Sequence, residues 1–254
     1  MARYERFFGT LALLCALASP AAFATEPPSI GVTLNGLLGS YNTGQGATTL
    51  PLVPLPIFEA HVPLGRLSID AEGLPPIGPI SYDDGRGATQ ATRIGYASAE
   101  VHYAFRGDRY AIGMGETLIT QATTFPTLFV RRMSSRVAGF RFSGRIRLQS
   151  NRAGHTDLEI GASPRMHAVQ RSVAAVSVCG PQGCVPRYFG FNDPEVASLA
   201  DVKLTHERPL GRYGLLYGIR YFNYVAHYPA APRQLADHDR FVMPFVGITA
   251  KLGP

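Results

Sequence analysis

Apolar and polar side chains alternate from Arg136 to Gln149, and this pattern constrains the fold more than any other feature of the sequence. One face carries Ala138, Phe140, Phe142, Ile146 and Leu148, and the other carries Arg141, Ser143, Arg145, Arg147 and Gln149. A period of two is that of a β-strand, whose successive side chains point to opposite sides. The segment therefore predicts one long strand between an apolar and a charged environment.

The same alternation recurs along the chain and predicts about ten strands. Their ranges are 30–40, 55–62, 66–73, 93–105, 109–123, 136–149, 156–171, 196–207, 212–226 and 240–252. The number falls to eight if the two short ranges near the beginning are not strands. The 27 glycines and 20 prolines of the chain are typical of a fold with many turns.

The predicted connections alternate between short and long. Short turns fall at 63–65, 106–108, 151–154 and 209–211, and long loops at 41–54, 74–92, 124–135, 172–195 and 227–239. Short periplasmic turns, long extracellular loops and an even strand number are typical of outer-membrane barrels. The sequence therefore predicts an all-β fold, a transmembrane antiparallel up-and-down β-barrel. The strands of a soluble barrel or sandwich would also alternate between apolar and polar side chains. The length of the predicted strands, the alternation of short and long connections and the features of the N-terminus described next favour a membrane barrel over a soluble fold.

The N-terminus has the order of a secretory signal peptide. Arg3 and Arg6 precede an apolar run, and the small residues that follow end in Ala22-Phe23-Ala24. We predict cleavage after Ala24, a barrel domain over residues 25–254 and localisation in the outer membrane of a Gram-negative cell envelope.

Two cysteines of the predicted mature chain, Cys179 and Cys184, are separated by Gly-Pro-Gln-Gly. Disulfides form and persist in an exported protein, so we predict a bridge that closes a loop. A metal site is the alternative, but two sulfur ligands without nearby histidines are only half of a zinc site. We predict no metal and no cofactor.

On the membrane interpretation, the polar face of the strands becomes the lumen, with many charges of both signs. The predicted lumen charge network comprises Glu59, His61, Asp70, Glu72, Glu100, His102, Arg141, Arg145, Arg147, Glu159, Arg165, His167, Asp201, Lys203, Glu207 and Arg220. An eight- to ten-stranded barrel is narrow enough for side chains to fill much of it, and buried charges need partners. A plugged lumen is therefore expected rather than an open pore.

Glu116 departs from this pattern, because it shares the apolar face with Ile112, Met114 and Leu118. A β-bulge near Gly113 or Gly115 could turn it inward. A carboxylate facing lipid is costlier near the midplane than near the interface, so we expect a bulge or a rim position.

The motifs of common catalytic sites are missing from the sequence. There is no G-x-S-x-G, no phosphate-binding G-x-x-x-x-G-K-[ST], and no H-E-x-x-H. The pairs Glu59/His61 and Glu100/His102 could support acid–base chemistry, but a structural place in the lumen network is the simpler interpretation. We therefore assign no catalytic residue.

The chain resembles small single-chain bacterial outer-membrane β-barrel proteins over nearly its whole mature length. Asp83-Asp84 and Asp237-His238-Asp239 also resemble the rim carboxylates and Asp/His pair of the omptin proteases, which are ten-stranded barrels. Small outer-membrane barrels in general usually end on an aromatic residue, whereas this chain ends Lys251-Leu252-Gly253-Pro254. Outer-membrane lipid, lipopolysaccharide and the outer-membrane assembly machinery are the partners that the general resemblance implies.

Three classes of function remain open. The first is a structural or surface-interaction barrel acting through its extracellular loops. The second is an outer-membrane enzyme acting on lipid A, phospholipid or peptide, and the third is a narrow channel. The net charge is +6, and the sequence contains no block of consecutive Lys and Arg residues. A nucleic-acid partner is therefore not expected.

Overall fold

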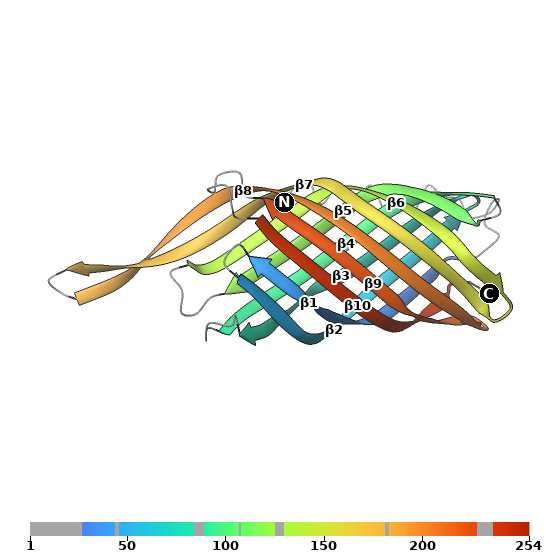
Figure 1. Cartoon of the computed structure of the whole chain (residues 1–254), viewed down its shortest axis with the longest axis horizontal. Helices are drawn as coiled ribbons and strands as arrows, with labels where there is room; N and C mark the ends of the chain where they lie inside the picture. Colours follow the sequence, from blue (N-terminus) through green and yellow to red (C-terminus); the bar gives the residue numbers. More distant parts are fainter. Residues whose placement is uncertain are drawn as a thin grey trace.

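Ten antiparallel strands close into one barrel (Figure 1). The computed structural model describes residues 27–43, 46–83, 89–106, 108–124, 130–180, 183–227 and 236–253. The strands are β1 Ser29–Thr43, β2 Gly46–Leu64, β3 Leu67–Asp83, β4 Thr89–Phe105, β5 Tyr110–Thr124, β6 Val130–Asn151, β7 Gly154–Gly180, β8 Gly183–Leu210, β9 Tyr213–His227 and β10 Ala236–Lys251. Each strand pairs with its sequence neighbours, and β1 pairs with β10. The predicted fold class and the ten strands are confirmed, while the predicted signal peptide lies outside the described residues.

The barrel is apolar on its outer surface and charged inside, the reverse of a soluble protein. Large apolar side chains such as Phe140 and Met114 are 69% and 64% exposed on the outer face. Arg141 and Arg220 are, by contrast, among the most deeply buried side chains. The outer face therefore suits lipid, and part of the interior is occupied by charged side chains. No helix in the described ranges is long and apolar enough to cross a membrane.

One end of the barrel is closed by tight turns. Two-residue turns at Gly65-Arg66 and Gly211-Arg212 connect β2 to β3 and β8 to β9. The φ angles of Gly65 and Gly211 are +73° and +70°, in the left-handed region that glycine adopts without strain. The predicted turn positions are correct at this end, which is the periplasmic end of an outer-membrane barrel.

At the opposite end the strands continue into ranges that were predicted as loops. β1 and β2 extend over most of 41–54, and β7 and β8 over most of 172–195. Beyond Ala174 and before Val196 these last two strands pair only with each other. They form a two-stranded ribbon that projects past the barrel (Figure 1). The alternation could not reveal these extensions, because both faces of a strand beyond the membrane meet water.

Glu116 lies in the middle of β5, exposed on the outer face, with Ala99 and Phe140 as its register partners. The register of β5 is uninterrupted along both neighbours, so the bulge expected near Gly113 or Gly115 does not occur. The expectation of a bulge or rim position for Glu116 is therefore wrong.

Candidate functional site in the barrel lumen

Arg141 of β6 is the centre of a charged layer that crosses the lumen. Its side chain is completely buried. Its Nε donates to Glu100 Oε1 at 2.5 Å, and its Nη2 donates to Asp201 Oδ2 at 2.9 Å and to Glu159 Oε1 at 3.4 Å. Three strands, β4, β7 and β8, thus supply carboxylates to one guanidinium. A buried guanidinium is tolerated only with this kind of complete pairing.

Arg220 of β9 continues the layer. Its Nη2 lies 2.7 Å from Glu72 Oε1 and 3.4 Å from Asp201 Oδ2, so Asp201 is shared with Arg141. The Arg220 guanidinium also lies over the Phe222 ring, 4.2 Å from its centroid. Arg220 therefore joins charged groups on one side to an aromatic ring on the other.

Lys203 completes the layer from β8. Its Nζ lies 2.9 Å from Glu59 Oε1 and 3.6 Å from Glu72 Oε2. We call the connected set the ionic layer; its members are Glu59, Glu72, Glu100, Arg141, Glu159, Asp201, Lys203 and Arg220. They come from seven of the ten strands, β2, β3, β4, β6, β7, β8 and β9. The layer therefore connects opposite walls of the lumen.

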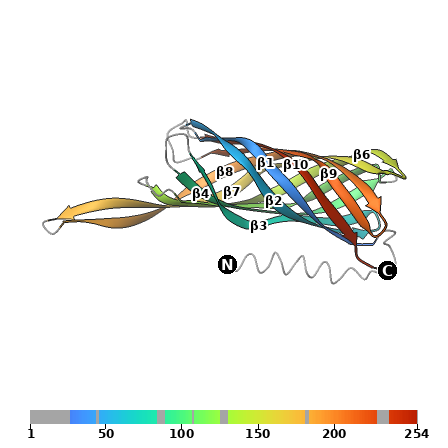
Figure 2. The same cartoon turned by 90° about the horizontal axis from the view of Figure 1, so that it is seen from below.

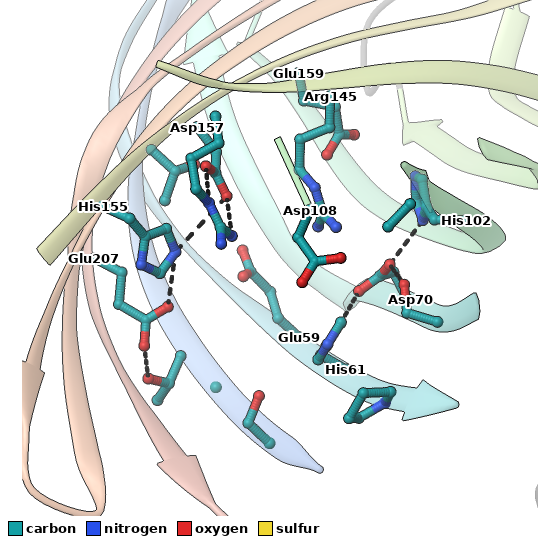
Figure 3. A pocket seen from close by; sticks show the side chains of 18 of the residues that line it. Glu59, His61, Asp70, His102, Asp108, Arg145, His155, Asp157, Glu159 and Glu207 are labelled. Atoms are coloured by element: carbon teal, nitrogen blue, oxygen red, sulfur yellow. Dashed lines mark hydrogen bonds and ion pairs between the residues drawn. The ribbon is translucent and has the colours of Figure 1, made fainter. Parts of the chain in front are cut away.

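A polar cavity of about 480 Å³ lies between the ionic layer and the short turns (Figure 3). On one side Asp70 is held between two imidazoles, with His61 Nδ1 at 2.5 Å and His102 Nδ1 at 2.7 Å from its carboxylate. His102 Nε2 lies 2.9 Å from Ser143 Oγ, which donates to Glu100 at 2.5 Å. Both histidines thus contact Asp70, and His102 Nε2 also lies 3.9 Å from Oε2 of Glu100, the glutamate of its own strand.

On the other side of this cavity, Arg147 forms a two-point contact with Asp157, at 2.9 and 3.1 Å. His155 Nε2 lies 3.7 Å from both Asp157 and Glu207 (Figure 3). Asp157 and His155 are lumen residues that the predicted network omitted, although Asp157 has the same parity as Glu159. Among the described residues, no group of three or more His, Cys, Asp or Glu side chains could hold a metal ion.

Two members of the predicted network lie elsewhere. Arg165 and His167 are exposed, and Met166 between them is completely buried. The register with β8 shifts between Ser163 and Met166, which is the signature of a β-bulge. The extra residue reverses which side chains point inward, so the prediction that Arg165 and His167 face the lumen is wrong. The other predicted members line the polar cavity or belong to the ionic layer.

On the loop side of the ionic layer the lumen becomes apolar. A second cavity of about 130 Å³ is lined mainly by aliphatic and aromatic side chains from nine of the ten strands. Its buried core consists of Leu37, Leu55, Ile57, Leu74 and Met243. We call it the apolar cavity. A uniformly polar lumen was expected, so this site was missed.

Tyr96 joins the apolar cavity to the ionic layer. Its ring packs edge-to-face against Phe222, with the centroids 5.9 Å apart. Its hydroxyl donates to Glu72 at 2.6 Å and accepts from Arg220 at 3.2 Å. The polar end of Tyr96 is thus satisfied within the ionic layer, and its ring presents an apolar surface to the cavity.

The structure does not place the His238 and Asp239 side chains, which resemble the Asp/His pair of the omptin proteases, on one face of their strand. His238 is exposed and Asp239 is buried, so the two point to opposite sides of β10. Asp84 and the side chains of Asp83 and Asp237 lie outside the described part of the chain.

A scan against protein-family models and a search of curated proteins both find no match. Among solved structures the chain is similar to the outer membrane protease OmpT of Escherichia coli, with 9% identity, a TM-score of 0.52 and coverage of 92% of this chain and 100% of that one. It also matches the CymD monoaromatic hydrocarbon channel (8% identity, TM-score 0.45, 91% and 90% covered) and Neisserial surface protein A (11%, 0.27, 88% and 97%). Identities this low show the fold alone. That fold is the outer-membrane β-barrel.

Proposed function

We propose that this outer-membrane barrel binds a small, uncharged, apolar molecule in the apolar cavity, on the loop side of a lumen closed by the ionic layer. The observation that carries the proposal is the apolar cavity itself, in a lumen whose other half is charged. A lumen that served only as a structural plug could pair charges throughout. The ligand class follows from size and chemistry: an apolar cavity of about 150 Å³ binds one benzene ring in an engineered protein.

The ionic layer weighs against the narrow-channel alternative. Its charges pair with one another across the lumen rather than lining an open path. The acid–base interpretation of the histidines gains no support either, because His61 and His102 are both engaged by Asp70. Binding on the loop side therefore remains the function best supported by the lumen.

Benzene binding can be followed at Met243, which lines the apolar cavity and is buried. In protein labelled with ¹³C at the methionine methyls and held in detergent micelles, benzene should shift the Met243 resonance saturably. Met114 is an internal control, because it is exposed on the outer face and should move only linearly as benzene dissolves in the micelle. Cyclohexylammonium, of similar size but charged, should leave Met243 unchanged. A linear response at both methionines would contradict the proposal.

Leu199→Trp should weaken benzene binding by about tenfold or more, since it fills the cavity that Leu199 lines. The matched control is Leu34→Trp, the same exchange on the lipid-facing surface, where Leu34 is 53% exposed. Leu199→Ala should retain benzene and admit a larger ring system. Equal affinities in all three variants would place benzene outside the apolar cavity.

A surface-interaction role through the extracellular end is a second candidate, favoured by the β7–β8 ribbon. Val185, Tyr188 and Phe189 are all more than half exposed on it. An isolated two-stranded ribbon is marginally stable in water, and its open edges can pair with another strand. Cys179 is the register partner of Cys184 at the tip, where the predicted disulfide would hold the ribbon together.

If the ribbon associates with its counterpart on neighbouring cells, cells displaying the protein should settle faster than cells displaying the triple variant Val185→Ser/Tyr188→Ser/Phe189→Ser. The apolar side chains supply the attraction, so their loss should abolish the difference from cells without the protein. A matched polar control on the same ribbon is Arg187→Ser/Asn192→Ser, which should settle like wild type. Settling unaffected by the triple variant would contradict this role.

A further inference from the structure

The barrel wall is incomplete between β2 and β3. The two strands pair from Leu64 and Leu67 only as far as Phe58 and Gly73. β2 nevertheless continues to Gly46 and β3 to Asp83, and each remains paired to those ends with its other neighbour, β1 or β4. We call the stretch where residues 46–57 face 74–83 without pairing the β2–β3 seam. The two strands diverge toward the long-loop end in Figure 2.

Prolines on both sides explain why the seam stays unpaired. Pro54 and Pro56 lie on β2, and Pro75 and Pro76 on β3. Proline lacks the N–H that a ladder requires and is found in sheets only at edges and bulges. Pro54 and Pro56 both have register partners on β1, so the lack of an N–H group at these two positions does not interrupt the pairing of β2 with β1. The N–H groups that the two prolines lack would have pointed to the other edge of β2, which faces β3. Pro75 and Pro76 fall where the register of β3 with β4 shifts.

The seam lies at the height of the membrane. Pro56 is the register partner of Leu34, and Leu34 is also the partner of Val246. Both Leu34 and Val246 are more than half exposed on the outer face. An unpaired strand edge in hydrocarbon leaves costly unsatisfied N–H groups. Proline removes these donors, so it is the residue type that best permits an open edge there.

The apolar cavity reaches both sides of the seam. Leu55 and Ile57 of β2 and Leu74 of β3 are buried and line the cavity. These are the first lumen-facing residues past the last β2–β3 pair. The wall between the cavity and the lipid is therefore formed here by side chains alone, without a hydrogen-bonded ladder.

We infer that the β2–β3 seam is a lateral portal through which small apolar molecules pass between the apolar cavity and the hydrocarbon of the membrane. The inference rests on the ligand class of the proposed function. The ionic layer blocks the periplasmic side of the cavity, and an apolar molecule is far more concentrated in lipid than in water. The seam joins the cavity directly to that lipid.

Quenching by brominated lipid tests the portal without any ligand. The chain contains no tryptophan, so single-tryptophan variants report on one position each. Three leucines make a matched set: Leu74→Trp at the seam, Leu199→Trp in the same cavity on β8, where Leu199 has a register partner on both β7 and β9, and Leu34→Trp on the lipid face. Each is reconstituted into vesicles of phosphatidylcholine carrying bromine on one acyl chain, and into unbrominated vesicles. A heat-dependent shift on a gel verifies that each barrel is folded.

The Leu34→Trp variant should lose most of its fluorescence in brominated vesicles, and the Leu199→Trp variant should lose little. The portal predicts that the Leu74→Trp variant loses as much as the Leu34→Trp variant. Protection equal to that of Leu199→Trp would overturn the inference. If Leu74→Trp does not fold, Ile57→Trp reports from the other side of the seam.

The benzene titration at Met243 separates the two proposals. Saturable benzene binding with a shielded Leu74→Trp reporter would overturn the portal and leave the proposed function in place. A quenched Leu74→Trp reporter without benzene binding would support an open seam and overturn the proposed ligand.

Discussion

Replacing Arg141 with methionine should lower the free energy of unfolding by about 3–5 kcal/mol, the usual result of removing one partner of a buried ion pair. Arg141 is completely buried and contacts Glu100, Glu159 and Asp201. Without the guanidinium these three carboxylates, which converge on the same point, would repel one another. Urea unfolding of the protein in lipid vesicles measures the loss.

Arg145→Met is the matched control for Arg141→Met. Arg145 lies on the same strand and lines the polar cavity, but it is only half-buried. Its replacement should change stability by less than about 1 kcal/mol. Adding Glu100→Gln and Asp201→Asn to Arg141→Met should restore part of the loss, because neutral amides no longer repel. Equal effects of Arg141→Met and Arg145→Met would show that the ionic layer is not what holds the lumen together.

Gly161→Ala should destabilise the barrel by about 1–3 kcal/mol, because an added Cβ would overlap the guanidinium of Arg141. A flexible arginine could move aside at little cost, but this one is held by Glu100 and Asp201. Gly144→Ala is the control, since a Cβ there meets nothing within 4 Å.

A double-mutant cycle gives the sharper test of this prediction. In the Arg141→Met background the added methyl of Gly161→Ala should have little effect, because the group that it displaces is gone. Additive losses in the double variant would mean that Gly161 serves another purpose, such as the pairing of β7 with its neighbours.

Most of the lumen charges could be predicted because every second residue of a strand points to the same face, which is a property of the strand alone. Glu100 and His102, or Arg145 and Arg147, share a face whatever the rest of the chain does. The prediction failed at Arg165 and His167, where one inserted residue at the bulge reverses the parity. Pro164 is a visible signal for that bulge, since proline is found in sheets at such irregularities.

The apolar cavity also had a signal in the sequence. Phe222 and Tyr224 share the parity of Arg220 on β9, and Tyr96 shares that of Glu100 on β4. These aromatic residues thus belong to the inward face, but an expectation of a uniformly polar lumen hides them. The prolines of β2 and β3 are likewise visible in the sequence: Pro54, Pro75 and Pro76 fall in ranges predicted as loops, and Pro56 falls in a predicted strand.

The sequence was enough to predict an antiparallel barrel of about ten strands, the end with the short turns and most of the inward-facing charges, because each depends on alternation and turn chemistry over a few residues; the structure settled the number at ten rather than eight. The tertiary structure alone decided which charges pair, as with Asp70 between His61 and His102. It also decided that the charged and apolar side chains separate into two halves of the lumen, and that the cavity meets the β2–β3 seam. These features depend on the stagger of strands far apart in the chain. The period of a single strand carries no information about that stagger.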